Sequence, residues 1–96
     1  MSPHKRKKLS KIRSELDKLD NTLIKVIKKR TTLVNKVLAL KDKKNQIVDQ
    51  RRIKLILKNI KKKSIQNKID PKITNRIWKN MIWSYIDYEK RNFKKR

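Results

Sequence analysis

The sequence predicts an all-α protein, and three observations carry this prediction. The chain of 96 residues has no glycine and only two prolines, so few positions oppose helix formation. Apolar residues recur at steps of three and four, which places them on one face of a helix. Two later segments begin with helix-start signals, at Asp49 and at Asp70-Pro71. We therefore expect three helices, of which the first is much the longest.

The first helix is expected from about residue 7 to residue 42. Its apolar stripe comprises Leu9, Ile12, Leu16, Leu19, Leu23, Val26, Ile27, Leu33, Val34, Val37 and Leu38. Because no proline or glycine interrupts this pattern, the helix would be roughly 50 Å long at 1.5 Å per residue. The basic ends of the chain, residues 1–6 and 94–96, are expected to fray.

Two shorter helices are expected to follow a loop at residues 43–46. Asp49 caps the first of them, and its last turn carries the lysines 61–63, which complement the helix dipole. Asp70-Pro71 opens the other, which runs to about Asn92. The apolar residues of these two helices are Ile53, Leu55, Ile56, Leu57 and Ile60, then Ile73, Ile77, Trp78, Met81, Ile82, Tyr85 and Phe93.

The predicted lengths indicate one domain, residues 1–96 with a core at about 9–93, that does not close on itself. The first helix is about twice the diameter expected for a globule of about 100 residues. The shorter helices can cover only part of its apolar stripe, and a second copy of the same chain is the usual cover for the rest. We expect an intertwined homodimer.

The charge balance is strongly basic, with 31 Lys and Arg against 8 Asp and Glu and a net charge of +23. Such an excess points to an anionic partner, and nucleic acid is the first class to consider. Compositional drift is the alternative, because the chain is crowded with Lys, Ile and Asn, as AT-rich coding would produce. The lysines fall on all faces and form no known DNA-reading motif, so we expect no specific nucleic-acid partner.

Several kinds of site and location are not expected. The chain has no cysteine, and its one histidine is His4 in a polar amino-terminal tail, so disulfides, thiolate chemistry and a His/Cys metal site are disfavoured. No window holds the roughly 18 apolar residues of a membrane span. The basic residues 1–8 are followed by no apolar stretch of the kind that a secretory signal needs. We expect a cytoplasmic protein that does not associate with membranes.

Two cations occupy positions where the first stripe calls for apolar residues. Arg30 and Lys41 are eleven residues apart, so they point the same way roughly 16 Å apart along the helix axis. A buried unpaired cation costs several kcal/mol, so each needs an anion or a wet cavity. Both also have explanations without a ligand, because Arg30 can reach solvent at the edge of the stripe and Lys41 can complement the helix dipole.

Glu89 is the acid that departs most from its surroundings. It continues the series Trp78, Ile82 and Tyr85 on an otherwise apolar and aromatic face. A carboxyl on such a face is expected to be protonated unless a cation keeps it ionised. Glu89 is therefore either a structural partner of Lys41 or Arg30, or part of a pocket suited to a small molecule that bears carboxylates.

The chain resembles the AroQ-type chorismate mutases. The stretches that carry the resemblance are residues 12–20 (IRSELDKLD), Lys29-Arg30, residues 37–41 (VLALK), residues 47–52 (IVDQRR), and Ile77-Trp78 leading to Glu89. The resemblance implies an intertwined dimer of three-helix protomers with two active sites. It also implies the rearrangement of chorismate to prephenate, a dianionic substrate handled without metal or cofactor.

The resemblance assigns the two substrate carboxylates to arginines. Arg30 and the Arg13 of the other protomer bind them, with Arg52 assisting. Helix geometry permits this division, because seventeen residues turn Arg13 and Arg30 about 100° apart and separate them by about 25 Å. One protomer could hardly bring both to one small ligand.

The remaining roles fall to Lys41, Asp49, Tyr85 and Glu89. By resemblance, Lys41 donates to the ether oxygen of the substrate and Asp49 lies beside the ring hydroxyl. Tyr85 stands where serine is common, and its hydroxyl takes a carboxylate contact. Glu89 stands where many relatives carry glutamine, and it can donate to the ether oxygen only when protonated. Ile53 departs from the family, because a glutamate usually contacts the substrate hydroxyl there.

Two alternatives to the mutase stay open. An isochorismate-pyruvate lyase has the same fold and also carries an aliphatic residue at the position of Ile53. A small basic nucleic-acid-binding protein would explain the charge and would show steeply salt-dependent binding. That second alternative leaves the alignment of Arg13, Arg30 and Lys41 unexplained.

Overall fold

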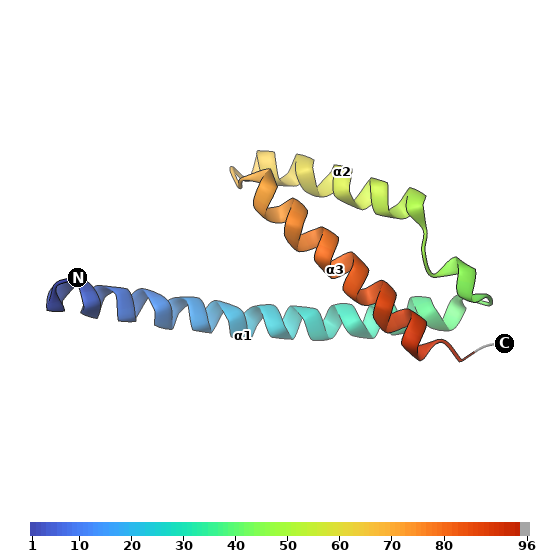
Figure 1. Cartoon of the computed structure of the whole chain (residues 1–96), viewed down its shortest axis with the longest axis horizontal. Coiled ribbons are helices and arrows are strands. Elements are labelled where there is room, and N and C mark those ends of the chain that lie inside the picture. Colours follow the sequence, from blue (N-terminus) through green and yellow to red (C-terminus); the bar gives the residue numbers. More distant parts are fainter. Residues whose placement is uncertain (95–96) are drawn as a thin grey trace. The chain divides into compact units, whose positions relative to one another are not determined.

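The computed structural model describes residues 1–94, and these residues are almost entirely helical (Figure 1). Helix α1 spans Pro3–Leu40, the short 3-10 turn η1 spans Lys44–Gln46, α2 spans Gln50–Gln66 and α3 spans Pro71–Asn92. No strand occurs within 1–94, so the all-α prediction with a long first helix is confirmed. The chain divides into two compact units, Met1–Leu33 and Val34–Arg96.

The first unit is the amino-terminal part of α1, and the helix begins earlier than the sequence analysis predicted. The Ser2 hydroxyl accepts a hydrogen bond from the Lys5 amide at 3.2 Å, and the Ser2 carbonyl accepts from the Arg6 amide at 2.9 Å. Pro3 then occupies the first helical position, which its fixed φ angle favours. The prediction that residues 1–6 fray is therefore wrong for residues 3–6. At the other end, Lys94 lies outside any helix, and residues 95–96 lie outside the described part of the chain.

The apolar stripe of this first unit is uncovered in the single chain. No residue of α1 is buried. Ile12, Leu16, Leu19 and Leu23 expose 54%, 53%, 61% and 56% of their surface. A continuous apolar face of this kind on a protein surface marks an interaction site.

The second unit holds a small apolar core between α2 and α3. Ile47, Ile82 and Ile86 are buried, and Leu38, Val48, Ile53, Ile56, Leu57 and Phe93 pack against them. Each buried aliphatic side chain contributes about 1.5–3 kcal/mol by leaving water. The core thus ties the segment after α1 to the carboxyl half of α3.

The apolar residues predicted for the shorter helices are not all buried. Ile73 and Ile77 are in the predicted apolar group of α3, yet they expose 55% and 52% of their surface. Ile86, which was not in that group, is buried instead. In α2, Leu55 is also exposed. Ile73, Ile77 and Ile86 lie at the edges of the apolar stripe of α3, where side-chain spacing alone does not decide burial. Leu55 instead lies about 150° around α2 from the centre of its apolar stripe.

Both predicted helix starts are confirmed, and the turn that joins α2 to α3 has a defined geometry. Asp49 accepts from the Arg52 amide at 3.0 Å and Asp70 accepts from the Lys72 amide at 2.9 Å. At the end of α2, the Ile69 amide donates to the Ser64 carbonyl and the Lys68 amide to the Ile65 carbonyl. This is the Schellman pattern, and it places Lys68 in the left-handed region at φ 56°.

A buried pair of hydroxyls joins α2 to α3 near this turn. Ser64 is 3% exposed, and its Oγ lies 2.6 Å from the Thr74 Oγ1. The same Oγ donates to the Ile60 carbonyl at 2.6 Å, so this buried polar group is satisfied. The periodicity of apolar residues gave no sign of this contact.

Candidate active site

Lys41 directly follows the last residue of α1. The helix ends at Leu40, two residues before the predicted end, and the Lys41 amide donates to the Leu38 carbonyl at 3.1 Å. Lys41 therefore does not continue the helical stripe as expected. Its side chain leaves the helix end and reaches toward α3.

Lys41 and Glu89 form a buried ion pair. The Lys41 Nζ lies 2.9 Å from the Glu89 Oε2, and the two side chains are 18% and 9% exposed. The same Nζ donates to the Ile47 carbonyl at 3.5 Å. Removing one partner of such a pair typically costs about 3–5 kcal/mol, because the other charge is left uncompensated. Of the partners left open for Glu89, the structure brings Lys41 to it.

The turn after Lys41 is held by a single side-chain amide. The Gln46 Oε1 accepts from the backbone amides of Asp42 and Lys43 at 2.7 and 2.9 Å. The residues between α1 and α2 are thus an ordered turn around η1, which fixes the direction in which the chain leaves Lys41. The sequence predicts a loop at these residues, but no pattern in it indicates the role of Gln46.

A second polar contact joins α3 to the end of α1 within the same unit. The Tyr88 hydroxyl donates to the Asn35 Oδ1 at 2.8 Å. The rings of Tyr88 and Tyr85 meet edge to face, with centroids 6.4 Å apart. Tyr85 lies about one turn before Glu89 on α3, and it is half-buried. The tyrosines thus help to set the position of Glu89 against Lys41.

Asp49 and Arg52 come together at the start of α2. The carboxylate of Asp49 caps the helix through the Arg52 amide, and the Arg52 side chain is exposed. The next residue, Ile53, is half-buried and packs against the core. Ile53, where the resemblance implies a glutamate, therefore has a packing role in this chain.

Arg13 and Arg30 lie on α1 within the first unit, Met1–Leu33. Seventeen residues of continuous helix hold them about 25 Å apart along the axis, so one copy of α1 does not bring them together. Of the predicted site residues, the structure joins the side chains of Lys41 and Glu89, whereas Asp49 meets Arg52 through the backbone amide of the helix cap.

The described residues form neither a metal cluster nor a membrane span. Across residues 1–94, no group of three or more His, Cys, Asp or Glu side chains is placed to hold a metal ion. Within the same range, no helix is long and apolar enough to cross a membrane.

The helices and the ion pair define a class of small all-helical protein with a buried lysine–carboxylate pair between the end of α1 and the end of α3. The chain belongs to the chorismate mutase type II family, which matches over residues 12–90. The matched range begins just before Arg13 and ends just after Glu89, and it confirms the resemblance drawn from the sequence. The family supports a function of the chorismate-mutase type. Neither a curated protein nor a solved structure gives a significant match to the chain.

Proposed function

We propose that this protein is a chorismate mutase, an isomerase that converts chorismate to prephenate in phenylalanine and tyrosine biosynthesis. The observation that carries the proposal is the Lys41–Glu89 pair at 2.9 Å, formed by the two residues that the resemblance assigns to the ether oxygen. Family membership supports the reaction type. The Lys41–Glu89 pair supplies a hydrogen-bond donor for the ether oxygen of the substrate.

The reaction takes place within one molecule, because the ether C–O bond breaks as a C–C bond forms. It needs no nucleophile, and an enzyme accelerates it by holding the reactive conformer and stabilising the charge that develops on the ether oxygen. The Lys41 ammonium has three donors. One meets Glu89, one is directed at the Ile47 carbonyl, and the third is available for the ether oxygen.

Glu89 supplies the second donor in this proposal. A carboxyl donates only in its neutral form, whereas Glu89 is ion-paired with Lys41 in the substrate-free chain. A dianionic substrate brings further negative charge to the site, which favours the neutral form of a neighbouring carboxyl. In this proposal Glu89 donates to the ether oxygen from its neutral form in the substrate complex.

The substrate carboxylates are assigned to Arg30, Arg52 and the Arg13 of a second copy, with the Tyr85 hydroxyl as a further contact. Two observations support a dimer. The apolar residues of α1 are about half exposed in the single chain, and α1 holds Arg13 and Arg30 too far apart to meet at one small ligand. An intertwined second copy would cover these apolar residues, and it would bring its own Arg13 to the Arg30 of the first copy.

The test is the loss of chorismate, followed by absorbance, for the purified wild-type chain and for Arg30→Ala. We expect wild-type activity and a loss of at least about 100-fold in the variant, because a charged contact to the substrate is removed. Arg76→Ala on α3 is the matched control and should keep its activity. An inactive wild-type protein that is folded would contradict the proposal.

Ile53 favours a second candidate, the isochorismate-pyruvate lyase of the same fold. Its aliphatic side chain packs on the core and leaves no carboxylate there for the substrate hydroxyl. The mutase is preferred because the lyase pattern has glutamine at the position of Glu89 and no acid at the position of Asp49. Offering chorismate and isochorismate separately, and detecting prephenate or salicylate, distinguishes the two reactions.

A further inference from the structure

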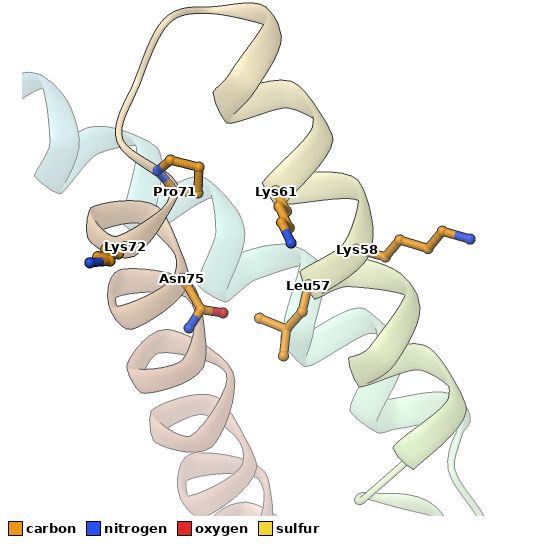
Figure 2. A pocket seen from close by; sticks show the side chains of 6 residues that line it. All are labelled: Leu57, Lys58, Lys61, Pro71, Lys72 and Asn75. Atoms are coloured by element: carbon orange, nitrogen blue, oxygen red, sulfur yellow. The ribbon is translucent and has the colours of Figure 1, made fainter.

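A shallow groove runs between α2 and α3 close to the turn that joins them. It is lined by Leu57, Lys58 and Lys61 of α2 and by Pro71, Lys72 and Asn75 of α3. Leu57 and Asn75 point into the space between the helices, whereas Lys58 and Lys72 project away from it on opposite sides (Figure 2). The groove therefore has a narrow, mostly apolar floor and a basic rim on each helix.

The rim on α3 continues as a stripe of cations that ends at a tryptophan. Lys72, Arg76, Lys79 and Trp83 fall within about 60° of one another on the helix and extend over roughly 17 Å. All four are exposed, and Trp83 exposes 49% of its surface. Tyr85 lies about 150° around the same helix from this stripe. The stripe thus faces away from the candidate active site.

Almost no acid offsets this charge. Residues 50–79 contain eleven Lys and Arg and a single acidic residue, Asp70, whose carboxylate is engaged in capping α3. The next acid on α3 is Asp87, one turn after Trp83, and its charge is offset by an ion pair with Arg91 at 2.8 Å. The rims therefore present a positive field to solvent.

We propose that this surface binds single-stranded nucleic acid without sequence preference. Lys58, Lys61, Lys72, Arg76 and Lys79 contact the phosphates, and one base stacks on Trp83. Basic grooves with an exposed aromatic side chain bind single strands in this way, since every base has a π-face. The floor offers only Leu57 and Pro71 as apolar contacts, too few for an acidic amphipathic helix that docks through anchors on successive turns.

The test uses the full chain and a fluorescent oligothymidylate of about 20 nucleotides, with binding followed by anisotropy over a salt series. The variant Lys58→Gln/Lys61→Gln/Lys72→Gln should bind at least about tenfold more weakly, and its salt slope should fall by about two, at about 0.7 per lost phosphate contact. The matched control removes the same charge from scattered exposed positions of α1, as Lys18→Gln/Lys25→Gln/Lys36→Gln. The affinity of this control for the oligonucleotide should fall by no more than about threefold, because only the general positive field of the protein is weakened.

The fluorescence of Trp83 gives a measurement that depends on base stacking and not on charge alone. Bound oligonucleotide should quench its fluorescence, Trp83→Phe should abolish that quenching, and Trp78→Phe should keep it. Trp83→Ala should weaken binding by about tenfold. Equal losses in the two triple variants, absence of quenching, or equally tight binding of polyphosphate or a poly-glutamate peptide would each overturn the proposal. Chorismate turnover should be unchanged in Lys58→Gln/Lys61→Gln/Lys72→Gln, so the outcome is independent of the proposed enzymatic function.

Discussion

Glu89 is an acid with 7% of its surface exposed in a chain that carries a net charge of +23. Its Oε2 accepts from the Lys41 ammonium at 2.9 Å. The two residues are 48 positions apart, and both lie at the carboxyl end of a helix, Lys41 directly after α1 and Glu89 in the last turn of α3. Each side chain therefore determines where the other is held, and each also has a proposed part in the chemistry.

The pH dependence of the rate tests the proposed role of Glu89. If a neutral carboxyl donates to the ether oxygen, kcat/KM should fall as pH rises, because the donating form becomes rarer. Glu89→Gln donates at every pH, so its profile should be flatter across the same range. The control is Asp87→Asn, an exposed carboxyl on the same helix, which should keep the wild-type profile. Identical pH profiles for wild type and Glu89→Gln would contradict the donor role.

The contact between Tyr88 and Asn35 makes a separate prediction about stability. Tyr88→Phe removes the hydroxyl that donates to the Asn35 Oδ1, and we expect the free energy of unfolding to fall by about 0.5–1.5 kcal/mol. Urea unfolding of Tyr88→Phe, Asn35→Ala and the double variant measures the coupling between the two side chains. Ser84→Ala is the control, because that hydroxyl bonds only within its own helix. Additive effects of the two single changes would show that the contact contributes nothing.

At the scale of elements, the end of α2 carries a residue that its geometry does not favour. Lys68 adopts φ 56° in a Schellman turn, where glycine is usual because a Cβ is strained in that region. Lys68→Gly should therefore raise the free energy of unfolding by up to about 1 kcal/mol. The same change at Lys63, inside α2, should lower it by about 1 kcal/mol. Thermal or urea unfolding of the pair checks the prediction, and a loss of stability in both variants would contradict it.

The helix starts could be predicted from the sequence because their signals are local. Asp49 and Asp70-Pro71 act within three residues of themselves, and Ser2-Pro3 shows the same combination of cap and proline, although the sequence analysis read it as a frayed end. The end of α1 had no such signal, since no glycine or proline follows Leu40. The apolar pattern therefore placed the end two residues too late.

The candidate site was predictable only in part, because its contacts join distant segments. Glu89 stood out as an acid on an apolar face, and that anomaly led to its pairing with a cation. The Tyr88–Asn35 bond spans 53 residues, and neither residue breaks the pattern around it. The burial of Ile86 and the exposure of Ile77 likewise depend on how α2 lies against α3, which periodicity alone does not specify.

At the scale of the whole molecule, the chain lacks a core large enough to cover its apolar residues. Within residues 1–94, three aliphatic side chains are buried. No residue of the α1 stripe is buried, although Leu38 near its end packs against this core. Small domains of this kind commonly need oligomerisation or another supplement to be stable. The proposed second copy would meet this need, and the unfolding midpoint should then rise with protein concentration, because association stabilises the folded chains. A midpoint that is independent of concentration would contradict the proposed dimer.

The proposed sharing of Arg13 between copies is tested by mixing two inactive variants. Arg13→Ala and Arg30→Ala should each be inactive alone, because every site then lacks one carboxylate contact. In a mixed dimer, one site combines the intact Arg30 of the first variant with the intact Arg13 of the second, and the other site lacks both. Since random exchange makes about half of the dimers mixed, unfolding and refolding the two together should restore about a quarter of the wild-type activity. Mixing two batches of the same variant is the control and should restore none. If Arg13 instead served the site of its own chain, each mixed dimer would keep one defect in every site and the mixture would stay inactive.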